Sequence, residues 1–267
     1  MKVKKKAVLW LGIVTVLLLL YISYIFPIPR GERVNPQYYS YYKNLMGIYY
    51  ISVENSIGLF NHGIYRYLNE VDPNTFQVLA EAWAKDKNHV WHRGEIVEVA
   101  DIASFKIDKS GLAKDKNHVY VDDEKEGFHA TKCGIDVETA EYFILESPEW
   151  FSISWMRDKN NVFFHEKRAG VDRNTFRQLG QTQWLMDKDG IYTVCWDTSL
   201  NKNVFVKVDS LQTPIDTLST GYLRNGRNVI YLSKIIVKDK DITKFEEVGH
   251  DGCRVNDMLF ENGSLVK

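Results

Sequence analysis

One local pattern of polar and apolar positions occurs seven times along the chain and predicts most of its secondary structure. A polar cluster is followed by one apolar residue and then by a large apolar one, as in DKNHVWHR from Asp86. The seven copies read FNHGIYRY, DKNHVWHR, DKNHVYVD, DKNNVFFH, DKDGIYTV, NGRNVIYL and RVNDMLFE. A spacing of 29 residues separates three of the neighbouring pairs, and the longer intervals indicate insertions between repeats.

The position before each apolar pair holds only Gly, Asn, Asp or His, the residue types that most readily adopt positive φ. These predicted structural turn positions are Gly63, His89, His118, Asn161, Gly190, Asn228 and Asp257. A type I turn closed by a left-handed residue is a common hairpin connection, so each copy predicts a hairpin turn followed by a strand. On this interpretation His89 and His118 substitute for glycine, and valine at either position should destabilise the fold more than Gly or Asn.

A second periodic segment follows the strands: VDPNTFQVL from Val71 recurs as VDRNTFRQL from Val171. Asp followed three residues later by Thr, then Phe and Leu three apart, predicts N-capped helical turns at Asn74–Leu79 and Asn174–Leu179. Five to seven such units must stack to bury their aromatic faces. The 29-residue spacing is shorter than the roughly 40 residues of a four-stranded propeller blade. The predicted fold is therefore mainly β, with hairpin-like units and short helical turns stacked in an open or partly curled array.

The N-terminus predicts a membrane anchor. Four lysines within the first six residues precede an uncharged run, Ala7–Phe26, which as a helix would span about 30 Å, the thickness of a hydrocarbon core. A cleaved signal peptide is the alternative, but it requires a shorter apolar region and small residues at the cleavage site. The predicted organisation is a cytoplasmic tail (1–6), one transmembrane helix (7–26), a linker (27–44) and an extracytoplasmic repeat domain (45–267). The lysines place the N-terminus inside the inner (cytoplasmic) membrane, and the single-pass chain's C-terminal domain in the periplasm or outside the cell.

Composition narrows the classes of partner. The net charge of the 267 residues is -1, and nothing in its distribution suggests nucleic-acid binding. Cys133, Cys195 and Cys253 are an odd number without close pairing, so at most one disulfide is expected and burial must stabilise the fold. An aromatic content of 13% suits β structure.

Candidate chemistry is sparse, and neither a cofactor nor a metal site is predicted. A calcium loop from Asp115 lacks the required glycine, and the copies supply no pair of zinc ligands at a short spacing. His129 and Cys133 could form a thiolate pair, although their spacing of four residues beside an acidic stretch is more typical of a loop. No phosphate loop or nucleophile elbow occurs, so the sequence does not predict an enzyme. Trp83, Trp91, Trp155 and Trp184 could form a glycan-binding strip, but burial in the core is the expectation.

The repeated turns DKNHVW, DKNHVY and DKNNVFF, with the intervening Val-Asp-x-Asn-Thr-Phe segments, resemble the DKNYY family of bacterial envelope proteins, many of which carry a signal or membrane segment. The resemblance covers roughly Leu59 to Val237, and the last two copies depart from it. It implies a repeat protein of the cell envelope, and it assigns no catalytic residue.

Two classes of function remain. The first is a non-catalytic protein-interaction module, held at the membrane by its N-terminal helix, that presents stacked repeats to a protein partner. An immunity-type protein that neutralises an envelope-acting toxin is a specific version. The alternative is an envelope enzyme or glycan-binding protein acting on peptidoglycan or polysaccharide.

Overall fold

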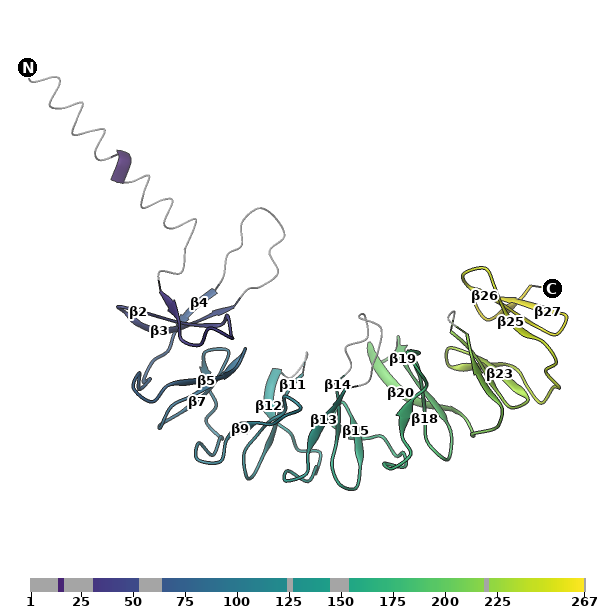
Figure 1. Ribbon diagram of the computed structural model, residues 1–267, viewed down its shortest axis with the longest axis horizontal. Helices are drawn as coiled ribbons and strands as arrows, with labels where there is room; N and C mark the ends of the chain where they lie inside the picture. The colour runs from purple at the N-terminus through teal and green to yellow at the C-terminus, as the bar shows by residue number, and fades with distance from the viewer. Residues whose placement is uncertain are drawn as a thin grey trace, which may run out of the picture. The chain divides into compact units, whose positions relative to one another are not determined.

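The computed structural model describes residues 14–16, 31–52, 64–123, 127–144, 154–218 and 221–266. Within these residues the strands form seven antiparallel sheets, each with four strands in sequence order (Figure 1). The prediction of a mainly β repeat fold is confirmed. The repeat itself is a four-stranded sheet, which corrects the predicted hairpin-like unit.

These residues divide into two compact units. The first extends to Ile107 and includes Asp115–Asn117. Its first sheet consists of β1 (Glu32–Arg33), β2 (Tyr41–Asn44), β3 (Gly47–Ser52) and β4 (Ile64–Tyr67). Its second consists of β5 (Gln77–Ala80), β6 (Trp83–Lys85), β7 (Val90–His92) and β8 (Glu95–Ile96), and β9 (Lys106–Ile107) follows.

The second unit comprises Asp108–Lys114 and the chain from His118 onward. Its first strands are β10 (Ala113–Lys114), β11 (Val119–Asp123) and β12 (Gly127–Ala130). The next sheets are β13 (Glu141–Ile144), β14 (Ser154–Arg157), β15 (Val162–Phe164) and β16 (Lys167–Arg168), then β17 (Arg177–Gln178), β18 (Trp184–Met186), β19 (Ile191–Asp197) and β20 (Lys202–Asp209). The last two are β21 (Ile215–Thr217), β22 (Tyr222–Asn225), β23 (Asn228–Tyr231) and β24 (Lys234–Val237), then β25 (Phe245–Val248), β26 (Gly252–Val255), β27 (Met258–Glu261) and β28 (Ser264–Leu265).

Short strands and tight turns explain how four strands fit a repeat that appeared too short for them. The whole second sheet lies between Gln77 and Ile96. Its strands are two to four residues long, below the usual length of about five. The spacing argument therefore failed because it assumed strands of ordinary length.

In the DKNNV copy both apolar positions are buried because the β13–β16 sheet packs on both faces. Val162 and Phe164 of β15 belong to a core shared with the following sheet, which contributes Leu185. Phe163, between them in sequence, belongs to a different core shared with Leu112 of the preceding repeat. Successive side chains of a strand point to opposite faces, so a sheet covered on both faces shows a continuous apolar run.

The predicted helical turns at Asn74–Leu79 and Asn174–Leu179 are each a single turn that leads directly into a strand. The N–H of Thr75 donates to the carbonyl of Asp72 at 3.2 Å, and Leu79 already lies in β5. In the other segment the N–H of Phe176 donates to the carbonyl of Asp172 at 2.9 Å. The three-residue spacing of Phe and Leu was interpreted as one helical face, whereas the Leu lies in the strand in the first segment and just after it in the second.

Two predictions concern the N-terminal part of the chain. Residues 27–44 were expected to be a linker, but Glu32–Arg33 and Tyr41–Asn44 are the first two strands of a sheet. The predicted transmembrane segment 7–26 lies outside the described residues except for Val14–Val16, which are helical. No helix in the described part of the chain has the length and apolar character needed to cross a membrane. The open or partly curled course of the array stays a prediction.

Candidate functional site

The predicted turn positions lie in turns, each immediately before a strand or at its first residue. They are His89 before β7, His118 before β11, Asn161 before β15, Gly190 before β19, Asn228 at the start of β23 and Asp257 before β27. Gly63 lies outside the described residues. None of the six described positions is among the residues with positive φ, so the proposed reason for the composition of this column is wrong. The expected penalty for valine at His118 no longer has a basis.

The left-handed residues are found instead in the next turn of several sheets. Arg93 and Gly94, with φ of 51° and 78°, form the two-residue connection between β7 and β8. Asn262 and Gly263, with φ of 47° and 72°, connect β27 and β28 in the same way. Positive φ at both positions is typical of the type I′ hairpin turn, for which Asn-Gly is a strong sequence signal. That signal was present in the sequence and was missed.

A buried aspartate, and not a left-handed residue, stabilises the repeated DKN turn. In the DKDG copy the side chain of Asp187 is 1% exposed. Its Oδ1 accepts hydrogen bonds from the backbone N–H groups of Asp189 (2.8 Å) and Gly190 (2.9 Å). Its Oδ2 accepts the N–H of Asp172 at 2.8 Å, which joins the turn to the preceding connection. The Tyr192 hydroxyl lies 3.1 Å from both oxygens. The carboxylate thus satisfies donors from two segments of the chain.

The same arrangement recurs at the other DKN turns. Each aspartate accepts at least one amide of its own turn through Oδ1 and the backbone N–H of the aspartate in the preceding connection through Oδ2. The equivalent residues are Asp86, Asp115 and Asp158, each at most 4% exposed.

The lysine of each DKN turn makes an ion pair with the aspartate of the connection. Lys188 Nζ lies 2.9 Å from Asp172 Oδ2. The Thr175 hydroxyl donates to Asp172 Oδ1 at 2.8 Å and accepts the backbone N–H of Lys188 at 3.0 Å. The equivalent groups are Lys87, Asp72 and Thr75; Lys116, Asp101 and Ser104; and Lys159, Asp136 and Thr139. These three residues of the two repeated motifs therefore form one bonded loop, which we call the Asp-Lys clasp.

The clasp lowers the pKa of the connecting aspartate. For Asp172 the hydrogen bond from Lys188 is the largest cause, followed by that from Thr175, and together they lower the pKa to about 2. The pKa values of Asp101 and Asp136 are lowered to about 2 for the same reason. At Asp158, burial alone would raise the pKa of the carboxyl group, but the amides it accepts lower it on balance. Each carboxylate is therefore held in its ionised form as a hydrogen-bond acceptor.

Asparagine takes over this role in the last two sheets. Asn225 accepts the N–H of Gln212 at 2.8 Å through Oδ1 and donates to Asp209 Oδ2 at 2.7 Å. Asn256 accepts the N–H of Thr243 at 2.8 Å and donates to the Asp241 carbonyl at 2.8 Å. These copies depart from the DKN sequence but retain a side-chain oxygen that joins the turn to the connection.

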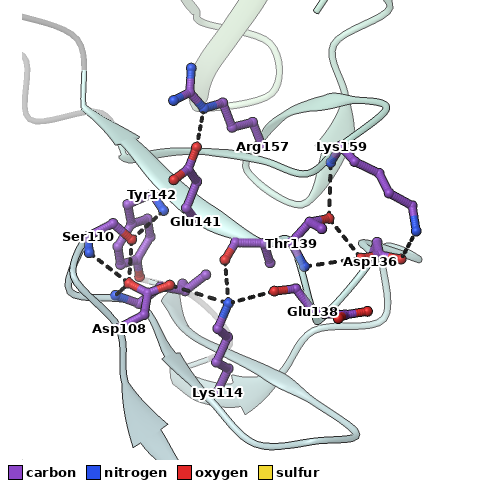
Figure 2. A network of polar contacts seen from close by, with 12 residues as sticks. Asp108, Ser110, Lys114, Asp136, Glu138, Thr139, Glu141, Tyr142, Arg157 and Lys159 are labelled. Atoms are coloured by element: carbon purple, nitrogen blue, oxygen red, sulfur yellow. Dashed lines mark hydrogen bonds and ion pairs between the residues drawn. The ribbon is translucent and has the colours of Figure 1, made fainter.

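The first lysine of AKDKN also has a structural role. Figure 2 shows the buried Lys114, whose Nζ donates to the carbonyl oxygens of Ala140 (2.6 Å) and Glu138 (3.4 Å) and lies 3.4 Å from Asp108 Oδ2. In the first unit, Lys85 donates to the carbonyl oxygens of Phe105 (2.9 Å) and Ile102 (3.5 Å). Both lysines thus satisfy backbone acceptors at the end of the following connection.

The two repeated histidines contact aromatic rings of the strands that follow them. The His89 ring centroid lies 5.4 Å from that of Trp91, and the His118 centroid lies 6.0 Å from that of Tyr120. His89 Nε2 is 3.7 Å from a carboxylate oxygen of Glu70. Among the residues that the structure describes, no group of three or more His, Cys, Asp and Glu side chains is placed to hold a metal ion.

The remaining candidates are likewise occupied in structural contacts. His129 Nε2 lies 2.7 Å from Glu166 Oε2, so the structure pairs this histidine with a carboxylate, while Cys133, Cys195 and Cys253 are free thiols. The tryptophans considered for glycan binding are at most 9% exposed, which confirms the expectation of burial: Trp83, Trp91, Trp155 and Trp184.

Comparison with known proteins gives a match to one family model and none to a curated protein or a solved structure. The model of the DKNYY family matches residues 20–124. The matched stretch contains both DKNHV turns and the clasps formed by Lys87 and Lys116. Residues 20–124 of this chain are therefore similar to the DKNYY family, which is the resemblance that the repeated turns predicted.

Proposed function

We propose that this chain is a membrane-anchored extracytoplasmic repeat protein that acts as a non-catalytic protein-interaction module. The observation that carries the proposal is the use of the repeated polar residues. Their carboxylates, hydroxyls and ammonium groups bond to turns and connections of the fold itself. Stacked repeats offer the side chains of successive units to a partner, which is the usual basis of binding by repeat proteins.

Membrane anchoring is supported by the sequence of the N-terminus. The lysine cluster followed by the apolar run 7–26 is typical of a single-pass anchor with its N-terminus inside. Protease treatment of spheroplasts tests this topology. We expect degradation of the repeat domain and retention of a short N-terminal fragment in the membrane. Intact protein after treatment, or a mature N-terminus beyond Phe26, would contradict it.

Photo-crosslinking in intact cells tests the interaction module. A crosslinking residue at Trp196 or Leu200, which are 56% and 52% exposed on the β19–β20 hairpin, should capture a specific envelope protein. Binding of the purified pair should then weaken when the same residue is replaced by Asp. Purified protein that sediments with isolated peptidoglycan, or hydrolyses it, would favour the glycan alternative. For the immunity-type version, a neighbouring toxin gene whose product binds this chain is the decisive observation.

A further inference from the structure

The tip of the β2–β3 hairpin carries two highly exposed apolar side chains. Leu45 and Met46 form the two-residue connection between Asn44 and Gly47, which pair with each other. Leu45 is fully exposed and Met46 is 80% exposed. The tip is ordered, because the N–H of Met46 donates to Asn44 Oδ1 at 2.8 Å. Two adjacent exposed apolar residues on a fixed turn are unfavourable in water and indicate a binding surface.

The register of the first sheet places this tip where the chain enters the fold. β1 runs antiparallel to β2, with Glu32 opposite Lys43 and Arg33 opposite Tyr42. Gly31 therefore lies at the same end of the sheet as the tip, and a Cβ at Gly31 would come within 2.5 Å of the Lys43 carbonyl oxygen. Only four residues, 27–30, separate Gly31 from the end of the apolar run at Phe26. Five Cα steps span at most about 18 Å, so an anchor ending at Phe26 holds this end of the sheet close to the bilayer.

The side chains next to the tip have the chemistry of a membrane interface. Tyr42 and Tyr67 lie on either side of the buried Tyr49 on neighbouring strands, with ring centroids 5.8 Å and 5.2 Å from that of Tyr49. Tyr67 is 40% exposed, and its hydroxyl accepts the Asn44 amide at 2.9 Å beside the tip. Lys43, which precedes Asn44 in β2, is also exposed. Tyrosine is enriched at bilayer surfaces, and a lysine there attracts anionic headgroups.

We propose that the β2–β3 tip inserts Leu45 and Met46 into the boundary between headgroups and acyl chains of the anchoring membrane. This inference rests on the proposed anchor. The anchor makes insertion an intramolecular step, so two apolar side chains are enough for a contact that would be weak in a free protein. The first sheet is then docked on the membrane surface.

Fluorescence of the full chain in phosphatidylethanolamine–phosphatidylglycerol vesicles tests the insertion. An environment-sensitive dye is attached at Leu45→Cys, in a background with Cys133→Ser and Cys195→Ser. We expect a blue-shifted emission and about twofold quenching by lipids spin-labelled near the headgroup. Tyr39→Cys is the matched control, because Tyr39 is 60% exposed and precedes β2 at the opposite end of the same sheet. The dye at this control position should show a water-like emission.

A second variant separates insertion from mere proximity. A dye at Lys43→Cys should be blue-shifted with the native tip and should return to a water-like emission in Leu45→Asp/Met46→Asp. Flotation of the vesicles distinguishes the proposed anchor from the proposed insertion of the tip. Protein that floats but shows a water-like emission at Leu45 overturns the insertion and leaves the anchor intact. Protein that fails to float overturns the anchor and the insertion together.

Discussion

Four aspartates at equivalent positions explain why the DKN motif is repeated. Each is buried and binds amides from its own turn and from the preceding connection, as Asp187 does for Asp189, Gly190 and Asp172. A buried amide that loses its acceptor costs free energy because water cannot replace the bond. The motif therefore encodes a junction between two segments rather than a reactive group.

Replacing Asp187 tests this role. Asp187→Ala should lower the free energy of unfolding by about 2–4 kcal/mol, because three amides and the Tyr192 hydroxyl lose an acceptor. Asp187→Asn should cost less, since Asn225 and Asn256 serve as side-chain acceptors in the last two sheets. Urea unfolding of the full chain in detergent, followed by tryptophan fluorescence, measures the differences. Asp189→Ala in the same turn is the control, because that side chain is exposed; an equal loss there would refute the assignment.

The clasp predicts how stability depends on acid pH. Asp172 has a folded pKa of about 2, below its ordinary value of 3.8. A lowered carboxyl pKa stabilises the fold above the unfolded-state pKa, and this stabilisation is lost as the pH falls from about 4 to about 2. Lys188→Met should raise the pKa of Asp172, measured from its carboxyl-carbon chemical shift, and should flatten the pH dependence in this window. Lys116→Met belongs to another clasp and should leave the titration of Asp172 unchanged; no shift in Lys188→Met would exclude the ion pair.

At the scale of the element, two kinds of turn allow four short strands to form one sheet. The DKN turn depends on a side-chain acceptor, whereas the following turn depends on positive backbone φ, as at Arg93 and Gly94. Strands of two to four residues supply few backbone hydrogen bonds. The turns and the packing against neighbouring sheets therefore contribute much of the stability of each sheet. The sequence pattern indicates the DKN turn more clearly than the following turn because the Asp of the DKN turn is repeated.

Glycine at position 94 combines two requirements that can be measured separately. Gly94 has φ of +78°, and an added Cβ would lie 2.9 Å from Tyr50 Cβ in the neighbouring sheet. Gly94→Ala should cost about 2–3 kcal/mol, from backbone strain and from the collision. Gly111 has φ of +89° with no atom within 4 Å of an added Cβ. Gly111→Ala should therefore cost only about 1 kcal/mol, and equal urea midpoints for the two variants would show that packing at Gly94 is unimportant.

At the scale of the whole molecule, stability comes from cores shared between neighbouring sheets. In the second unit, Trp155 and Leu185 meet in one core, Trp184 and Leu223 in the next, and Tyr222 shares a further core with the last sheet. Consecutive residues of one strand, such as Trp184 and Leu185, thus stabilise different interfaces. An array of this kind behaves as a chain of nearest-neighbour interactions.

Loss of one tryptophan should therefore act locally. Trp155 is fully buried, so Trp155→Ala should cost about 3–5 kcal/mol. Hydrogen exchange should accelerate in β13–β16 and β17–β20, which share the damaged core, while β25–β28 keep their protection. Trp196→Ala is the control because that side chain is 56% exposed. Equal loss of protection in β13–β16, β17–β20 and β25–β28 would show that the second unit unfolds as one cooperative block.

Local residue chemistry was enough to determine the repeat, the mainly β class and the position of each described turn. The column containing His89 and Asn161 precedes strands because polar turn formers followed by paired apolar residues have few other structures available. The aspartate of each DKN turn was also visible as a turn former. Only the structure shows that its second oxygen binds a connection 14 to 22 residues away, because such a contact leaves no periodic trace in the sequence.

The number of strands in a repeat and the backbone conformation of the turns were decided by tertiary packing. Strands such as Glu95–Ile96 are too short to produce an alternating pattern, and they become strands because neighbours pair with them and cover them. His89 and His118 do not have positive φ, and the amides of their turns are bonded to a buried carboxylate, so residue type alone suggested the wrong conformation. The early strands Glu32–Arg33 and Tyr41–Asn44 were missed because they are too short to show an alternating pattern and become strands through pairing within the first sheet.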